Sequence, residues 1–330
     1  MYQRFFGLQE LPFELTPNPK YLFLTSQHRE ALANLQYGLS SPKGITLLLG
    51  EAGTGKTTLL RAAHASESCR SVQSVYLTNP TLTRDEFVRM LARGLELGGD
   101  AENSKDAFLE RLERALIERR DRGQITALVV DEAQSLSEEL LEEVRLLANC
   151  ETTTQKLLPL VLAGQPELGD RLNEYHLRHW KQRIALRCRI GPFTLYQTAA
   201  YIAARIGIAG SDPTSLFTRE AVVLIHEQSR GVPRIISTVC DNALLHGFAS
   251  GQRVVNSEIV REVSRNFDLE PVVSLRHDTQ VAVSDLDPKA ADAEQAAEQT
   301  GRNKRALLAA DGTSRRLVGL ADANFKSSPQ

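Results

Sequence analysis

A glycine-rich stretch that ends in Lys56 and Thr57 has the residue types that most directly indicate chemistry. It follows an apolar run, reads GEAGTGKTT, and fits the pattern G-x-x-x-x-G-K-[ST]. Glycine tolerates the φ values that let backbone N–H groups wrap phosphates, and the N-terminus of the following helix attracts the same anion. We expect Lys56 to reach the β- and γ-phosphates and the Thr57 hydroxyl to bind Mg²⁺. The alternative is a glycine turn before a helix, with Lys and Thr there by chance.

The residues expected to contact the nucleotide are those of this loop and of the first helical turn: Gly50, Glu51, Ala52, Gly53, Thr54, Gly55, Lys56, Thr57 and Thr58.

Two carboxylates, Asp131 and Glu132, end a second apolar run, ITALVVDE. Strands buried on both faces of a parallel sheet read as continuous apolar runs, and ligands bind at their carboxyl ends. Asp131 is therefore expected to hold Mg²⁺ through water, as the Walker B acid does, and Glu132 to orient and deprotonate the attacking water. The alternative is a strand end followed by an acidic helix cap. Together the two motifs predict a site for ATP and Mg²⁺ that hydrolyses ATP.

The rest of the pattern predicts an α/β domain followed by helices only. Apolar runs indicate strands at 44–49, 72–80, 125–131, 157–164 and 184–190, separated by helical patterns. Strands that alternate with helices predict a parallel sheet. After Pro192, helical patterns cover 194–210, 218–231, 233–250 and 256–267. We expect four parts: an N-terminal linker segment at 1–40, the nucleotide-binding domain at 41–191, an α-helical lid at 192–267 and a disordered tail at 268–330.

The composition sets limits on the class of protein. The net charge is −2, which gives no overall attraction to nucleic acid or anionic lipid. The four cysteines have no C-x-x-C spacing, so we expect reduced core residues rather than a zinc or disulfide framework. We see no signal peptide and no apolar run near the length of about 18 residues that a membrane helix needs. We expect a soluble, cytoplasmic protein without a transmembrane segment.

Several motifs, in order along residues 1 to about 267, resemble those of the ExeA-type ATPases, which are AAA+ proteins. They are MYQRFFGLQELPFELTPNPKYLFLTSQHREAL, GEAGTGKTTLLR, VVDEAQSLSEELLEEVRLLANCET, VLAGQPEL, QRI and SRGVPRIIS. The resemblance implies a P-loop AAA+ base with a helical lid, ATP hydrolysis in nucleotide-dependent oligomers, and a role in envelope assembly. Members of this family energise secretion, and related ATPases accompany exopolysaccharide and exosortase systems. TniB/MuB-type transposition ATPases share the base and lid but bind DNA.

The best-known members of this family continue after the lid with a transmembrane helix and a periplasmic peptidoglycan-binding domain. The present sequence has only a short polar tail there, with a basic stretch at 302–320. From this departure we expect no direct binding of peptidoglycan, and we expect contact with the inner membrane only through a partner.

The resemblance also implies roles for Gln165 and Arg183. Gln165, in VLAGQPEL, stands where such ATPases keep a polar sensor of the γ-phosphate, although the usual residue is Asn, Ser or Thr. A glutamine that caps the loop is the alternative. Arg183 resembles the arginine finger, which reaches the γ-phosphate of a neighbouring subunit. Arg178, Arg187 or a surface salt bridge are the alternatives for that position.

We also expect roles in the site for three further residues. Arg234, in GVPR, resembles the sensor-2 arginine of the lid, and Pro233 is suited to the first turn of a helix. Asn79, at the end of the second strand, is a candidate to hold Glu132 in an idle rotamer. His28 lies in the segment that borders the adenine in such ATPases, and the alternative is a purely structural histidine.

The sequence is compatible with three functions. The first is an ATP-driven motor or switch for envelope assembly that acts with a membrane or envelope protein. The second is a DNA-binding regulator of transposition, and the third is a nucleotide-binding scaffold that hardly hydrolyses. Lys56, Asp131 and Glu132 argue against the third. A local basic cluster is the feature that suits DNA: Arg178, His179, Lys181, Arg183, Arg187 and Arg189.

Overall fold

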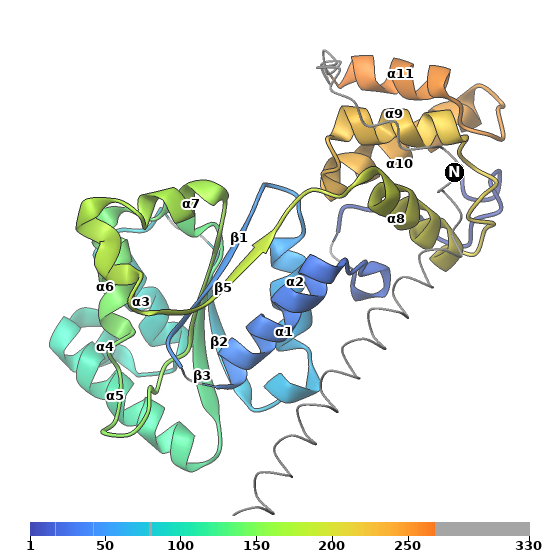
Figure 1. The fold of residues 1–330 in the computed structure, drawn as a ribbon. Coiled ribbons are helices and arrows are strands. Elements are labelled where there is room, and N and C mark those ends of the chain that lie inside the picture. Colours follow the sequence, from blue (N-terminus) through green and yellow to red (C-terminus); the bar gives the residue numbers. More distant parts are fainter. Residues whose placement is uncertain (17, 42, 79–80, 268–330) are drawn as a thin grey trace, which may run out of the picture. The chain divides into compact units, whose positions relative to one another are not determined.

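The computed structural model describes residues 1–16, 18–41, 43–78 and 81–267. Its centre is a parallel five-stranded sheet with the strand order β2-β3-β4-β1-β5 (Figure 1). Every residue of the three central strands β1, β3 and β4 is buried, which is why their sequences are unbroken apolar runs. The strands are β1 (Ile45–Gly50), β2 (Val72–Leu77), β3 (Ile125–Val130), β4 (Leu160–Gly164) and β5 (Ile184–Ile190).

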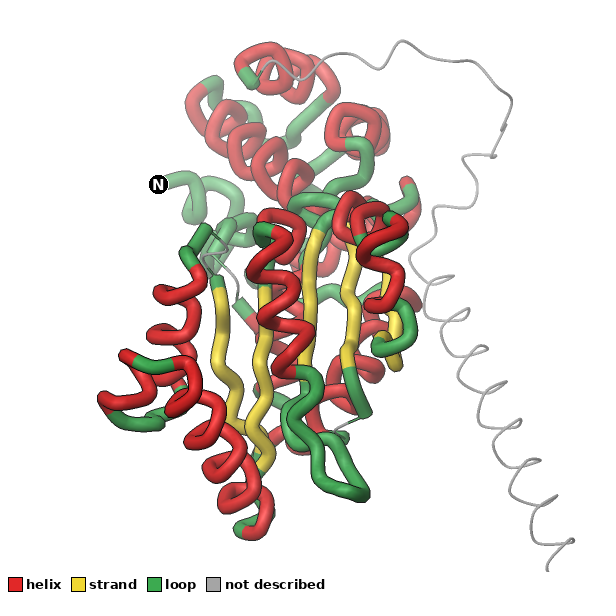
Figure 2. The backbone as a smooth tube through the Cα atoms, turned by 90° about the vertical axis from the view of Figure 1, so that its left-hand side faces the viewer, coloured by secondary structure: helices red, strands yellow, loops and turns green. Residues whose placement is uncertain are grey.

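Helices cover both faces of this sheet, and in Figure 2 several of them cross in front of the strands. Alternate side chains of β1 point to opposite faces, so Leu47 and Leu49 join one apolar core and Leu48 joins the other. The helices α1 (Ser26–Ser40) and α2 (Lys56–His64) pack on the core that contains Leu48. The other core is covered by α3 (Arg84–Gly94), α4 (Gly99–Asn103), α5 (Lys105–Asp121), α6 (Glu138–Leu147) and α7 (Pro166–Arg171).

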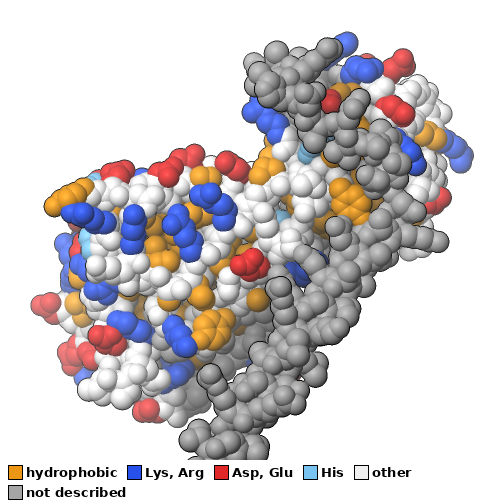
Figure 3. Space-filling model, viewed as in Figure 1, with side chains coloured by type: hydrophobic (Ala, Val, Ile, Leu, Met, Phe, Trp, Pro, Cys, Tyr) orange, Lys and Arg blue, Asp and Glu red, His pale blue; other side chains and the backbone are white. Residues whose placement is uncertain are grey.

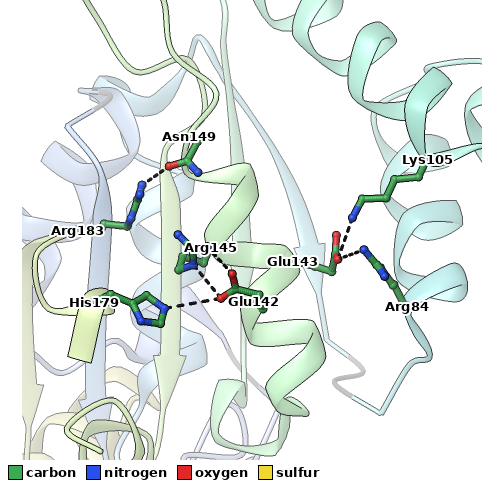
Figure 4. A network of polar contacts seen from close by, with 8 residues as sticks. All are labelled: Arg84, Lys105, Glu142, Glu143, Arg145, Asn149, His179 and Arg183. Atoms are coloured by element: carbon green, nitrogen blue, oxygen red, sulfur yellow. Dashed lines mark hydrogen bonds and ion pairs between the residues drawn. The ribbon is translucent and has the colours of Figure 1, made fainter. Parts of the chain in front are cut away.

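A buried carboxylate ties three of these helices together. Glu143 of α6 is only 7% exposed and pairs with Arg84 Nη2 at 2.5 Å and with Lys105 Nζ at 3.0 Å (Figure 4). Arg84 begins α3 and Lys105 begins α5, so one carboxylate fixes both helix starts against α6. A charge this far buried is stable only with such partners.

Four helices after β5, which we call the helical cluster, form a third apolar core. They are α8 (Leu195–Ile208), α9 (Arg219–Ser229), α10 (Pro233–Ala249) and α11 (Ser257–Asn266). Tyr2, Phe6, Leu8 and Phe13 of the N-terminal segment complete this core, and Gln9 N donates to Ala209 O at 2.8 Å. The segment predicted as one linker thus divides its contacts: residues 2–13 pack on the helical cluster, and α1 packs on the sheet.

The sequence prediction of a P-loop α/β fold with a parallel sheet and following helices is confirmed. Two predicted strands are shorter in the structure: the strand predicted for 72–80 ends at Leu77, and the strand predicted for 157–164 begins at Leu160. The four domain bounds stay predictions. The predicted tail at 268–330 lies outside the described residues. Within those residues no helix is both long and apolar enough to cross a bilayer.

Candidate nucleotide site

The loop between β1 and α2 has the conformation that its glycines allow. Gly53 and Gly55 have φ of 79° and 103°, in the left-handed region that a side chain disfavours. At Gly50 a Cβ atom would lie 2.8 Å from the backbone oxygen of Ile190. The Thr54 hydroxyl donates to Glu51 O at 2.8 Å and braces the loop from inside. These contacts give a loop whose backbone N–H groups can surround a phosphate.

Lys56 is the first residue of α2 and is only 4% exposed. Its Nζ donates to Gly50 O at 2.9 Å and to Glu51 O at 3.2 Å, so the ammonium lies across the loop. An ammonium group has three donors, and bonds to these carbonyls are compatible with a further bond to a phosphate oxygen.

Thr57, in the first turn of α2, and Asp131, directly after β3, are in direct contact. The Thr57 hydroxyl donates to Asp131 Oδ2 at 2.7 Å, across a separation of 74 residues in the sequence. A hydroxyl and a carboxylate are oxygen ligands of the kind that Mg²⁺ accepts together with water and phosphate oxygens. In the part of the chain that the structure describes, no cluster of three His, Cys, Asp or Glu side chains offers a metal site made by protein alone. The residues present therefore fit a Mg²⁺ ion that is bound with a nucleotide.

Glu132 follows Asp131 in a strained conformation. Its φ and ψ are 52° and 38°, which is left-handed and uncommon for a residue with a side chain. Its N–H donates to Asp131 Oδ1 at 2.9 Å, and its carboxylate Oε2 accepts from Gln134 Nε2 at 2.6 Å. Backbone strain of this kind often marks functional sites, because the surrounding contacts must hold it in place.

A cavity of about 370 Å³ lies over the loop, and Glu132 is on its wall. The phosphate loop, the N-terminal segment and the helical cluster all contribute to it. The backbone N–H of Arg234 donates to Gly53 O at 3.3 Å, so the first turn of α10 is seated directly on the loop. The lining side chains outside the loop and α2 are Glu14, Leu15, Thr16, Asn18, Tyr21, Leu22, Phe23, His28, Glu132, Phe193, Tyr201, Arg205, Pro233, Arg234 and Ser237.

His28 braces the loop from below. Its ring is buried, its Nε2 donates to Thr54 O at 3.1 Å, and its Nδ1 then accepts from the Thr25 hydroxyl at 2.7 Å. Burial lowers the pKa of His28, and the bond to the Thr54 carbonyl opposes that shift only in part. A neutral imidazole matches both hydrogen bonds. These contacts favour the structural alternative for His28, although its ring also borders the cavity.

One of the predicted residues, Arg183, lies away from the candidate site. Arg183 immediately precedes β5, and its carbonyl accepts from Ile45 N at the start of β1, so it lies at the end of the sheet opposite to the phosphate loop. At about 3.3 Å per residue, a strand of this length separates the two ends by roughly 20 Å. The Arg183 guanidinium donates to Asn149 Oδ1 (Figure 4). Arg183 therefore cannot serve the nucleotide site of its own chain. Asn79 lies outside the described residues.

Gln165 occupies the N-cap position of α7 at the carboxyl end of β4, without a capping hydrogen bond from its side chain. Its backbone N–H donates to Gln134 Oε1 at 3.0 Å. Gln134, which links this strand end to Glu132, was not among the sequence predictions. The only signal for it was its place two residues after the carboxylate pair.

The predicted basic cluster is spread over the η4 turn (Tyr175–Trp180) and the edge strand β5. Arg178 stacks its guanidinium 3.7 Å from the ring centre of Tyr175, which is 79% exposed. Arg187 and Arg189 are exposed on one face of β5. Figure 3 shows Lys and Arg side chains spread over one face of the α/β part.

Comparison with known proteins places this site in a family context. The family model described as an AAA domain matches residues 39–172. General secretion pathway protein A of Aeromonas hydrophila is 38% identical over 260 residues, which are 78% of this chain and 47% of that protein. The chain thus spans about half the length of this relative. ATP-dependent target DNA activator B of Escherichia phage D108 is 28% identical over 83% of this chain and 82% of its own length. Among solved structures, Cdc6p from Pyrobaculum aerophilum shares the fold with a TM-score of 0.60 at 22% identity, covering 77% of this chain and 70% of its own.

Proposed function

We propose that the chain hydrolyses ATP at the cavity over the phosphate loop. Two similarities support this proposal: the match of residues 39–172 to the AAA domain, and the 38% identity to general secretion pathway protein A over the region that the two chains share. The contact that carries the proposal is the hydrogen bond of 2.7 Å between Thr57 and Asp131. It joins the phosphate loop after β1 to the carboxylates after β3. A glycine turn with a chance Lys-Thr pair gives no reason for that contact.

The proposed reaction uses the residues at the floor of the cavity. The loop N–H groups and Lys56 bind the phosphates of ATP. Mg²⁺ bound by the Thr57 hydroxyl and, through water, by Asp131 would neutralise charge on those phosphates. Glu132 accepts a proton from a water molecule while the water oxygen bonds to the γ-phosphorus. The bond between that phosphorus and the β,γ-bridging oxygen breaks, which leaves ADP and inorganic phosphate.

Arg234 and Gln165 complete the proposed site from two sides. Arg234 is exposed on the wall of the cavity, and its backbone is bonded to Gly53, so we assign it to the nucleotide phosphates as a sensor in the lid. Gln165 remains the proposed γ-phosphate sensor at the end of β4. Its side chain does not line the cavity, and this weakens that assignment relative to Arg234.

Arg183 supports a proposal of self-association. Its position at the far end of the sheet excludes the site of its own chain, so an arginine finger here would act at the site of a second subunit, where it would stabilise charge on the γ-phosphate. We therefore propose an oligomer that forms with ATP and in which each site is completed by a neighbour's arginine.

We propose that the chain acts in envelope assembly, in secretion or exopolysaccharide export, and that it does so through a partner protein at the inner membrane. General secretion pathway protein A is the relative that suggests it. The second candidate is a DNA-binding regulator, which the exposed arginines of β5 and the likeness to the phage target DNA activator favour.

The two roles are separated by ATP turnover with and without duplex DNA across a salt series. Envelope assembly predicts turnover that DNA leaves unchanged. A DNA-binding regulator predicts stimulation that falls steeply with added salt, because phosphate contacts release counterions. Strong stimulation of this kind would replace the envelope proposal.

A further inference from the structure

The side chain of Gln134 bridges two strand ends at the candidate site. Its Nε2 donates to Glu132 Oε2 at 2.6 Å, and its Oε1 accepts from Gln165 N at 3.0 Å. A side-chain amide can donate to a carboxylate through its nitrogen and accept from a backbone N–H through its oxygen, without any change of protonation.

The strands explain why this bridge matters. Strand β4 pairs with β1 on one side, with Leu49 opposite Gly164, and with β3 on the other, with Val130 opposite Leu162. The end of β4 therefore lies between the phosphate loop and the two carboxylates. A side chain that ties Glu132 to Gln165 fixes the carboxylate relative to the strand beside the phosphate loop.

The surroundings hold Gln134 at both ends. Arg171 Nη1 donates to Gln134 O at 2.6 Å and to Leu136 O at 3.0 Å, which fixes the backbone of this turn. At Gly164 an added Cβ would come within 2.9 Å of Gln134 Oε1, so a residue without a side chain is what lets the amide cross β4. The left-handed backbone of Glu132 aims its carboxylate into this arrangement.

We infer that Gln134 is a positioning residue for ATP hydrolysis, which holds the carboxylate of Glu132 where it meets the attacking water. The inference rests on the proposed function. A carboxylate offers about four acceptor sites, so one bond from Gln134 leaves capacity to receive a proton. Orientation of a reacting group is worth large factors in rate, and it is lost when the group can rotate freely.

Two substitutions separate the two bonds of Gln134. Gln134→Met has a similar length and loses both bonds. Gln134→Glu keeps an acceptor for Gln165 N–H but replaces the donor to Glu132 with a second negative charge. For both variants we expect kcat to fall about 10- to 100-fold, with KM for ATP and the Kd of a non-hydrolysable ATP analogue within about threefold of the native values. The matched control is Gln124→Met, an exposed glutamine at the other end of β3, which should leave kcat unchanged.

A double-variant cycle tests whether Gln134 acts through Glu132. In a Glu132→Gln background there is no carboxylate to position, so adding Gln134→Met should change the residual single-turnover rate less than twofold. A purely structural role predicts the same loss in both backgrounds, and that result would overturn the inference. So would a kcat within twofold of native in Gln134→Met, or an analogue Kd that worsens as much as kcat falls.

The proposed function has a separate point of failure. If the native chain shows no turnover above that of Lys56→Ala, then ATP hydrolysis itself is rejected and the role of Gln134 with it. If the native chain turns over and Gln134→Met does so equally well, then only the role of Gln134 is rejected.

Discussion

The turn that seats α10 on the phosphate loop should be unusually sensitive to one added methyl group. Gly231 has φ of 72°, and a Cβ atom there would lie 2.1 Å from the backbone oxygen of Phe193. The two residues also share a hydrogen bond, because Phe193 N donates to Gly231 O at 2.7 Å. The atom in the way is backbone, so it cannot rotate aside, and Gly231→Ala must push the two segments apart.

The size of the effect follows from two contributions. The left-handed conformation costs a residue with a side chain roughly 1–2 kcal/mol. Separation of the segments also loses the hydrogen bond to Phe193 and leaves buried groups unpaired, at about 1–3 kcal/mol. We therefore expect Gly231→Ala to lower the free energy of unfolding by about 2–5 kcal/mol.

Gly251 provides the control, since it has a φ of 73° in the same helical cluster and an added Cβ would meet nothing within 4 Å. Gly251→Ala should show only the conformational contribution, about 1–2 kcal/mol. Urea unfolding of both variants measures the difference. Equal losses in the two variants would refute the close approach of Gly231 to Phe193, and with it the argument for how Arg234 is held over the loop.

Three other predictions test different parts of the structure. Glu143→Gln should lower the free energy of unfolding by about 1–3 kcal/mol, less than for a fully buried pair because both cations are partly exposed. Glu142→Gln, at a pair whose carboxylate is more exposed than that of Glu143, should cost under about 1 kcal/mol. Equal costs would contradict the role of Glu143 in tying three helices together. Because burial sets the pKa of His28 below its ordinary value of 6.5, the folded state binds fewer protons than the unfolded state just below that pH, and stability should fall as pH drops through this window. In His28→Asn the urea midpoint should change less between about pH 6.5 and 5 than in the native chain, and parallel curves would contradict it. Asp131→Asn should raise the Mg²⁺ concentration for half-maximal turnover about tenfold or more while leaving the fold intact by circular dichroism, and an unchanged Mg²⁺ requirement would remove Asp131 from the metal site.

Much of the fold could be predicted from local patterns in the sequence. The buried strands β1, β3 and β4 are unbroken apolar runs, and the glycines of the phosphate loop stand where the backbone turns left-handed. Each of these features depends on residues close together in the sequence. The α/β fold could be predicted for that reason.

Contacts between distant residues could not be read in the same way. The packing of Tyr2 and Phe13 on the helical cluster depends on residues about 200 positions away. The bridge from Glu132 through Gln134 to Gln165 depends on the order of the strands, which apolar runs do not specify. The position of Arg183 at the far end of the sheet likewise appears only when β5 is paired with β1.

We propose that Lys56, Thr57, Asp131 and Glu132 form one site of ATP hydrolysis. The most direct test is phosphate release from ATP and Mg²⁺ by the purified chain, beside Lys56→Ala and Glu132→Gln. We predict turnover by the native chain, none by Lys56→Ala, and in Glu132→Gln bound ATP that is retained with turnover at least about 100-fold lower. ATP turnover at the native rate in both variants would show that Lys56 and Glu132 do not belong to the hydrolytic site.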